Sequence, residues 1–205
     1  MDGQLTHTAP SILARARDIV LSPRAEWAKI ATEDTSSAQV SGRYVVPLAL
    51  IGPVAGVIGS QVFGGAAMGL RYYSSLSGAI TVGFIGFVLT IVTYALLTLI
   101  ADLLAPRFGG DLSPERASKL IAYGSTPVWL SGIFALVPAI SFLSILGLYS
   151  IYLIYLGATP ILNVPREKAG IFTGVLVLCG IALNFVVASL TVSATVLAVS
   201  MGLLG

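Results

Sequence analysis

Charged residues are scarce in this chain: lysine, arginine, aspartate and glutamate together make up only 10% of its 205 residues. A soluble domain carries roughly 25% of such residues, mostly on its surface. Hydrophobic residues make up 56% of the chain, so a water-soluble globule would lack the polar side chains to cover itself. This scarcity excludes an ordinary soluble protein and predicts that lipid surrounds most of the chain.

Cysteine and histidine are almost absent. The one cysteine, Cys179, lies inside an apolar run, so no disulfide can form within the chain. The one histidine, His7, has no cysteine or histidine partner at the spacing of a zinc site. No base accompanies a serine or cysteine nucleophile, and no phosphate-loop or dinucleotide motif occurs. We therefore expect no enzyme activity, no metal and no cofactor. Because the cations lie beside apolar runs, we also expect no nucleic-acid partner.

Five long apolar runs dominate what is present, each near the roughly 20 residues that a helix needs to cross a bilayer. They predict an all-α, polytopic transmembrane helical bundle over residues 44–205, preceded by an N-terminal arm over residues 1–43. The expected spans are about 44–64, 79–105, 117–137, 139–161 and 170–191. No charge follows Lys168, so a turn near Ser189–Ser193 could also create a sixth span; five are favoured.

The basic residues are distributed unevenly around these spans. All of the 11 lysines and arginines except Arg71 fall in the arm or in the loops after the second and fourth spans. Those three segments share one side of a five-span bundle. By the positive-inside rule, the arm is cytoplasmic and the chain is integral to the plasma (inner) membrane.

The arm has an amphipathic pattern. Within residues 12–20, apolar residues recur on one helical face, and Arg15 and Arg17 lie off that face. A second short helix follows Ser22-Pro23 and carries Trp27. One interpretation is an interfacial arm, with both arginines at anionic headgroups and Trp27 in the acyl boundary. The other, equally weighted, is an arm docked on the cytoplasmic face of the bundle.

The third span contains the sequence AYGSTPVW, with Pro127 about halfway along. Proline donates no backbone hydrogen bond, and its ring crowds the carbonyl of Tyr123. The weakened turn would be lined by Tyr123, Ser125 and Thr126. A structural kink is the more common explanation, and a ligand or gating element of a transporter is the alternative.

Three further polar residues lie within predicted spans. Asp102 is expected to form an interfacial ion pair with Arg107 or Lys119, with a proton or ion site as the alternative. Asn184 is expected to hydrogen-bond across helices. Tyr149 needs a partner inside the bundle, and the polar turn of the third span is the expected one.

Small residues recur at every fourth position of the first span, at Gly52, Gly56, Ser60 and Gly64. Such a ladder lets another helix approach closely. The partner is either another span of the same chain, which is favoured, or a second copy of the chain.

Three segments together resemble the Yip family of Ypt/Rab-interacting proteins, in particular its compact bacterial members. They are SPRAEWAKI, AYGSTPVW and LGLYSIYLIYLGATPILNVPREKAG. The resemblance implies five transmembrane helices with a cytoplasmic N-terminus, and it assigns no catalytic residue. Eukaryotic relatives bind small prenylated GTPases and act in vesicle traffic and membrane shaping. This chain lacks the long acidic arm typical of those relatives, which argues against a GTPase partner.

Two functions fit these features. The favoured one is a non-enzymatic membrane scaffold, adaptor or membrane-organising factor, with the lipid bilayer, other membrane proteins or a second copy of itself as partners. The alternative is a small transporter or channel that uses the proline-broken third span, Tyr149 and Asp102. A polar cavity inside the bundle would favour transport.

Overall fold

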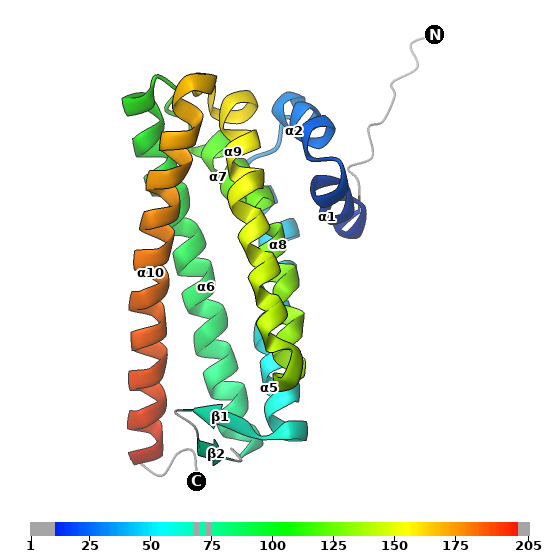
Figure 1. The fold of residues 1–205 in the computed structure, drawn as a ribbon, viewed down its shortest axis with the longest axis vertical. Helices are drawn as coiled ribbons and strands as arrows, with labels where there is room; N and C mark the ends of the chain where they lie inside the picture. Colours follow the sequence, from blue (N-terminus) through cyan, green and yellow to red (C-terminus); the bar gives the residue numbers. More distant parts are fainter. Residues whose placement is uncertain (1–10, 68–69, 73–74, 201–205) are drawn as a thin grey trace.

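The computed structural model describes residues 11–67, 70–72 and 75–200, and almost all of these are helical (Figure 1). Within them, four helical segments are long and apolar enough to cross a membrane. They cover Ser37–Phe63, Leu76–Phe108, Pro138–Leu162 and Arg166–Ser193. These segments confirm a multi-pass helical bundle, and the long helices run side by side along its length in Figure 1.

Two short helices form the arm, beside the bundle in Figure 1. Helix α1 (Ile12–Leu21) begins at Ser11, whose hydroxyl accepts a hydrogen bond from the Ala14 amide. Helix α2 (Pro23–Thr32) begins with a proline, which needs no amide partner in the first turn. Ile19 of α1 and Trp27 and Ile30 of α2 are fully buried, so the apolar faces of both helices pack against protein.

The first long helix is irregular. It consists of α3 (Ser37–Val40), the π-helical turn η1 (Ser41–Val45), α4 (Val46–Ala49) and α5 (Ile51–Phe63). A capping box between Ser36 and Gln39 starts it. It ends at Gly64, whose φ of 75° suits a residue without a Cβ. A short antiparallel hairpin follows, β1 (Gly65–Ala67) and β2 (Leu70–Tyr72). Its strands have only three residues each, and the all-α class is confirmed by the helices that make up almost all of the rest of the described chain.

The second and last long helices pack against each other. They are α6 (Leu76–Leu104), extended by the 3₁₀ turn η2 (Ala105–Phe108), and α10 (Arg166–Ser200). A Cβ placed on Gly180 of α10 would lie in ordinary contact with Leu97 of α6. Helix α10 continues without interruption through Ser189–Ser193, where a sixth span would have needed a turn.

The remaining chain runs along the bundle and back. The outward path is α7 (Pro114–Gly124), α8 (Thr126–Ser131) and the 3₁₀ helix η3 (Gly132–Leu136). The return path is the 3₁₀ helix η4 (Pro138–Leu148) and α9 (Tyr149–Leu162). The predicted third span is therefore interrupted at Ser125 and is not among the four long apolar helices.

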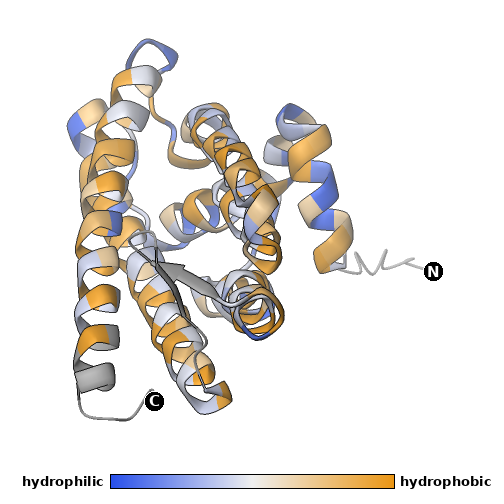
Figure 2. Ribbon diagram, turned by 60° about the horizontal axis from the view of Figure 1, so that its bottom comes forward, coloured by the Kyte–Doolittle hydropathy of each residue, from blue (hydrophilic) through white to orange (hydrophobic). Residues whose placement is uncertain are grey.

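The two ends of the bundle differ. We call the end with α2 and the connections before α7 and after α9 the arm end, and the end with β1 and β2 the hairpin end. The Asp111 amide donates to the Leu162 carbonyl at the arm end. Large apolar side chains elsewhere face outward, such as Phe142 at 70% and Phe185 at 72% exposure. Figure 2 shows this hydrophobic colouring along the long helices, as expected for helices surrounded by lipid.

Candidate functional site: the arm-docking cluster

Polar and aromatic side chains from the arm meet the bundle at one place. We call this group the arm-docking cluster: Arg15, Glu26, Trp27, Glu33, Tyr44, Tyr123 and Thr126. It joins α1, α2, the first long helix, and the interrupted α7–α8 segment. The α7–α8 segment lies far from the other three elements in the sequence, so only the fold brings the whole group together.

Arg15 is at the centre of the cluster and is only 5% exposed. Its guanidinium forms an ion pair with Glu26 at 2.5 Å and a second ion pair with Glu33. Lys29 also pairs with Glu26, at 2.9 Å. Burial lowers the pKa of Arg15, but the hydrogen bond and charge of Glu33 outweigh it, so the pKa is raised overall. Arg15 therefore remains charged, and its carboxylate partners compensate the charge inside the protein.

Trp27 fixes α2 to α9. Its indole N–H donates to the Leu153 carbonyl at 3.0 Å, and the side chain is buried. The ring lies over Gly157, where an added Cβ would come within 2.7 Å of two indole carbons. Gly157 thus leaves the space that the indole occupies, and any larger residue would push α2 away.

Two tyrosines connect the first long helix to the interrupted α7–α8 segment. The Tyr44 hydroxyl and the Thr126 hydroxyl are 2.7 Å apart, and the Thr126 hydroxyl also donates to the Tyr123 carbonyl at 2.7 Å. The two tyrosine rings meet edge to face with centroids 4.7 Å apart. The Arg15 guanidinium lies 5.5 Å from the centroid of the Tyr123 ring, a cation–π distance. The carbonyl exposed by Pro127 is therefore hydrogen-bonded within the protein.

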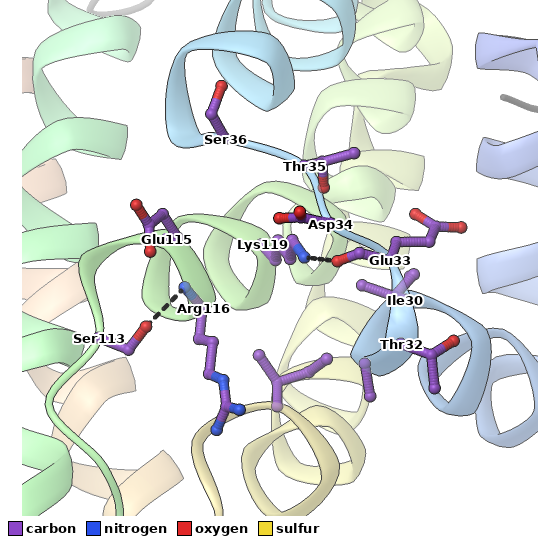
Figure 3. Close-up of a pocket in the computed structure, with 12 residues that line it drawn as sticks. Ile30, Thr32, Glu33, Asp34, Thr35, Ser36, Ser113, Glu115, Arg116 and Lys119 are labelled. Carbon is purple, nitrogen blue, oxygen red and sulfur yellow. Dashed lines mark hydrogen bonds between the residues drawn. The ribbon is translucent and has the colours of Figure 1, made fainter.

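A polar pocket of about 340 Å³ adjoins the cluster (Figure 3). Its lining combines acidic Glu33, Asp34 and Glu115 with basic Arg116 and Lys119. The Lys119 ammonium donates to the Glu33 carbonyl, and the Ser113 hydroxyl caps α7 at the Arg116 amide, as drawn in Figure 3. Lys119 thus joins α7 to the end of the arm.

The expected lipid contacts of the arm need correction. Arg15 and Trp27 are buried in the arm-docking cluster, because Glu26, Glu33 and the Leu153 carbonyl provide partners that a membrane surface would otherwise supply. Arg17 remains exposed, and its ion pair is with the adjacent Asp18 at 2.7 Å. Arg15 and Trp27 therefore belong to an arm that is docked on the bundle, and not to one that lies in the membrane interface.

The predicted intramembrane polar residues do not form one group. Tyr123 and Thr126 join the arm-docking cluster, whereas Pro127 lies in the first turn of α8. Tyr149 donates to the Val20 carbonyl of α1 at 3.1 Å, and not to the third span as expected. Ser125 and Asn184 both line a cavity of about 250 Å³, together with Thr90, Thr93 and Tyr94.

Asp102 and Asn184, like Tyr149, lack the partners that we expected. Asp102 forms no ion pair with Arg107 or Lys119 in the described chain, and its buried Oδ1 has no hydrogen-bond partner there. Asn184 donates to the Gly180 carbonyl of its own helix at 3.0 Å, so this hydrogen bond does not cross helices.

The small-residue ladder is only partly the contact face. A Cβ on Gly132 of η3 would lie 2.8 Å from the Gly52 Cα, and one on Gly59 would lie 2.6 Å from the carbonyl oxygens of Ala135 and Leu136. Gly56, by contrast, has no atom within 4 Å of its Cβ position. Ser60 hydrogen-bonds to Val57 in its own helix, and Gly64 ends the helix. The close approach therefore uses Gly52 and Gly59.

Sequence reasoning missed Glu26, Glu33, Tyr44 and Gly157. The available signal was weak: Glu26 and Lys29 have the i, i+3 spacing of a helical ion pair, but this spacing is usual on solvated helix faces.

Comparison with protein families gives one match. The family model described as the Yip1 domain matches residues 17–202, which is nearly the whole chain. The match includes the arm from Arg17 onward as well as the bundle. Comparisons with curated proteins and with solved structures found no match.

Proposed function

Because the chain belongs to the Yip1 domain family, we propose that it is a non-enzymatic membrane scaffold or adaptor that binds other membrane proteins through its docked arm. The observation that carries this proposal is the buried Arg15 pairing with two carboxylates of the arm, above the ring of Tyr123. Such a network holds a charged surface in a fixed position on the bundle. A fixed surface binds partners with a smaller loss of conformational entropy than a loose one.

The charged surface of the arm supports this role. Arg17, Arg24 and Lys29 are exposed on helices that the cluster immobilises. Exposed charges of this kind steer encounters with oppositely charged partners and contribute more to specificity than to affinity.

The experiment is cross-linking in native membranes followed by identification of neighbours. Arg15→Met should release the arm and remove a defined subset of neighbours, whereas Arg107→Met, which changes an exposed arginine outside the arm, should retain most of them. An identical set of neighbours for wild type and Arg15→Met would contradict the role of the docked arm.

The proposal also covers the topology. The chain crosses the inner membrane five times, and its N-terminal arm lies in the cytoplasm. The path α7–α8–η3 supports a fifth crossing, because it starts beside Leu162 at the arm end and reaches Gly59 towards the hairpin end. Arg71, the one cation expected on the opposite side, lies in β2.

Single cysteines test this topology in a Cys179→Ala background. Cysteines at Arg17 and Glu115 should react with a membrane-impermeant thiol reagent from the same side, and a cysteine at Ser75 from the other. If the cysteines at positions 17 and 115 react with the reagent from opposite sides of the membrane, the five-span arrangement is excluded.

A transporter or channel remains the second candidate, favoured by the cavity that Ser125 and Asn184 share. Proteoliposomes carrying a pH-sensitive dye test it directly. A proton or ion flux that Asn184→Leu abolishes would favour transport, whereas the scaffold proposal expects no flux above that of empty liposomes.

A further inference from the structure

A second cavity, of about 530 Å³, opens between α1 and the first turns of the long helix Ser37–Phe63. One part of its lining is polar, with Arg15, Arg43 and Tyr123, and another part is apolar, with Ile12 and Pro47. The cavity therefore offers both positive charge and an apolar surface where a membrane span begins.

The hydroxyl of Tyr123 is unpartnered beside this cavity. The residue is only 6% exposed, and its ring contacts Tyr44 and Arg15. Its carbonyl accepts from Thr126, but its hydroxyl has no hydrogen bond to any residue that the structure describes. The hydroxyl oxygen itself is accessible, since it is not among the enclosed polar atoms without a partner. It can therefore donate a hydrogen bond to a group that enters the cavity.

The residues that line this cavity also carry more positive than negative charge. Glu33 is the only carboxylate that lines the cavity, and it is paired with Arg15. Arg43 is exposed and forms no ion pair or hydrogen bond within the described ranges. Thr35, which lines the same cavity, has a buried hydroxyl without a partner among these residues. A group with negative charge and several acceptor oxygens would satisfy all of them.

The local backbone supports a site here. Arg43 and Tyr44 lie in the π-helical turn η1, a rare conformation that often occurs at functional sites. Tyr44 is buried and contacts Thr126, whereas Arg43 is exposed. In this turn Tyr44 thus points into the protein and anchors the helix, whereas the neighbouring Arg43 is available to a ligand.

We infer that this cavity binds the phosphate group of an anionic ligand, and that a membrane phospholipid is its source. Arg43 supplies the positive charge, since Arg15 is already paired with Glu26 and Glu33. Tyr123 and Thr35 donate hydrogen bonds to phosphate oxygens. Ile12 and Pro47 contact the apolar part of the lipid. This site is independent of the scaffold role, since it would bind lipid whether or not the arm binds a protein.

Native mass spectrometry of the full chain in detergent tests the site. Dioleoyl phosphatidylglycerol should bind more tightly than dioleoyl phosphatidylcholine. Arg43→Gln should weaken phosphatidylglycerol binding about tenfold, because it removes a charge-assisted contact. Tyr123→Phe, which removes only the hydroxyl, should weaken it about fivefold. Arg24→Gln changes an exposed arginine outside the cavity and should leave the affinity unchanged.

The outcomes separate the alternatives. Unchanged affinity in both cavity variants, or equal losses in Arg24→Gln, would overturn the site, because binding would then reflect overall charge alone. Inorganic phosphate at millimolar concentration distinguishes the source of the group. If it stabilises the wild type against heating and Arg43→Gln removes that effect, the site takes free phosphate; if it has no effect, the lipid assignment stands. Unaltered melting of each variant without ligand excludes misfolding as the cause.

Discussion

The arm end and the hairpin end of the bundle are built from similar apolar helices, but their side chains find different partners. At the arm end, Ile19, Trp27, Leu120, Leu153 and Phe172 are fully buried, and Arg15 and Glu26 are buried as an ion pair. Towards the hairpin end, η3 has no buried residue among those described, and Gly147 is the only one in η4. The arm end is therefore stabilised by contacts within the protein, and the other half depends on lipid to cover it.

This contrast determines where substitutions should be costly. Truncation of a buried side chain at the arm end removes contacts that nothing replaces. Truncation of an exposed apolar side chain on η4 or α10 exchanges one lipid contact for another. Near the hairpin end, only the positions where backbones approach closely should be sensitive.

Trp27→Ala should have the largest effect. It removes a buried indole and its hydrogen bond to the Leu153 carbonyl, so the free energy of unfolding in mixed micelles should fall by about 4 kcal/mol. Leu13→Ala is the matched control on the arm, because Leu13 is 79% exposed and should cost little. Similar losses for both variants would mean that the arm is not docked through Trp27.

Arg15→Met should rank second. It leaves Glu26 buried with Lys29 as its remaining ion-pair partner, and breaking a buried pair in this way costs about 3 kcal/mol. The double variant Arg15→Met, Glu26→Gln should be more stable than the single one, because the uncompensated carboxylate is gone. Arg17→Met, at an exposed ion pair, should change stability by less than about 0.5 kcal/mol. Equal losses in the Arg15 and Arg17 variants would remove the distinction between a buried and a surface network.

Four of the five expected spans were predictable, because each depends on local composition. The second was expected at 79–105, and α6 runs over Leu76–Leu104. The docking of the arm was not predictable, since the same amphipathic pattern suits a lipid surface and a protein surface. What decides between them is Gly157 and the Leu153 carbonyl, which lie more than a hundred residues away from Trp27. No local pattern in the arm contains that information.

Similarly, the third span was predictable as a proline-broken segment but its contacts were not. Pro127 removes an amide donor wherever it stands, so the interruption follows from sequence. That Tyr149 reaches the Val20 carbonyl of α1 depends on where the arm docks. Tyr149 was thus predicted to lie beside the polar turn of the third span, although in the structure it contacts the arm.

Gly59→Ala should destabilise the less protein-covered half of the bundle. Its Cβ would lie 2.6 Å from two backbone oxygens of η3, so the helices must move apart, at a cost of about 2 kcal/mol. Gly56→Ala is the matched control, because its Cβ enters open space and alanine favours the helix by up to about 1 kcal/mol. The reverse ranking would restore the small-residue ladder as first predicted, with Gly56 at the contact instead of Gly59.

Tyr149→Phe should have the smallest effect and the most local one. It removes a single hydrogen bond of 3.1 Å to the end of α1, so unfolding should become easier by about 1 kcal/mol. The ring and its contact with Tyr152 remain, which keeps α9 in place. Because the lost bond fastens only the arm, limited proteolysis around Leu21 should accelerate while protease resistance of the long helices stays the same. Tyr152→Phe is the control, since its hydroxyl has no hydrogen bond within the described residues. Equal acceleration by both variants would indicate that the arm is released by general loosening of α9, and that the arm end is less independent of the lipid-covered helices than its buried contacts suggest.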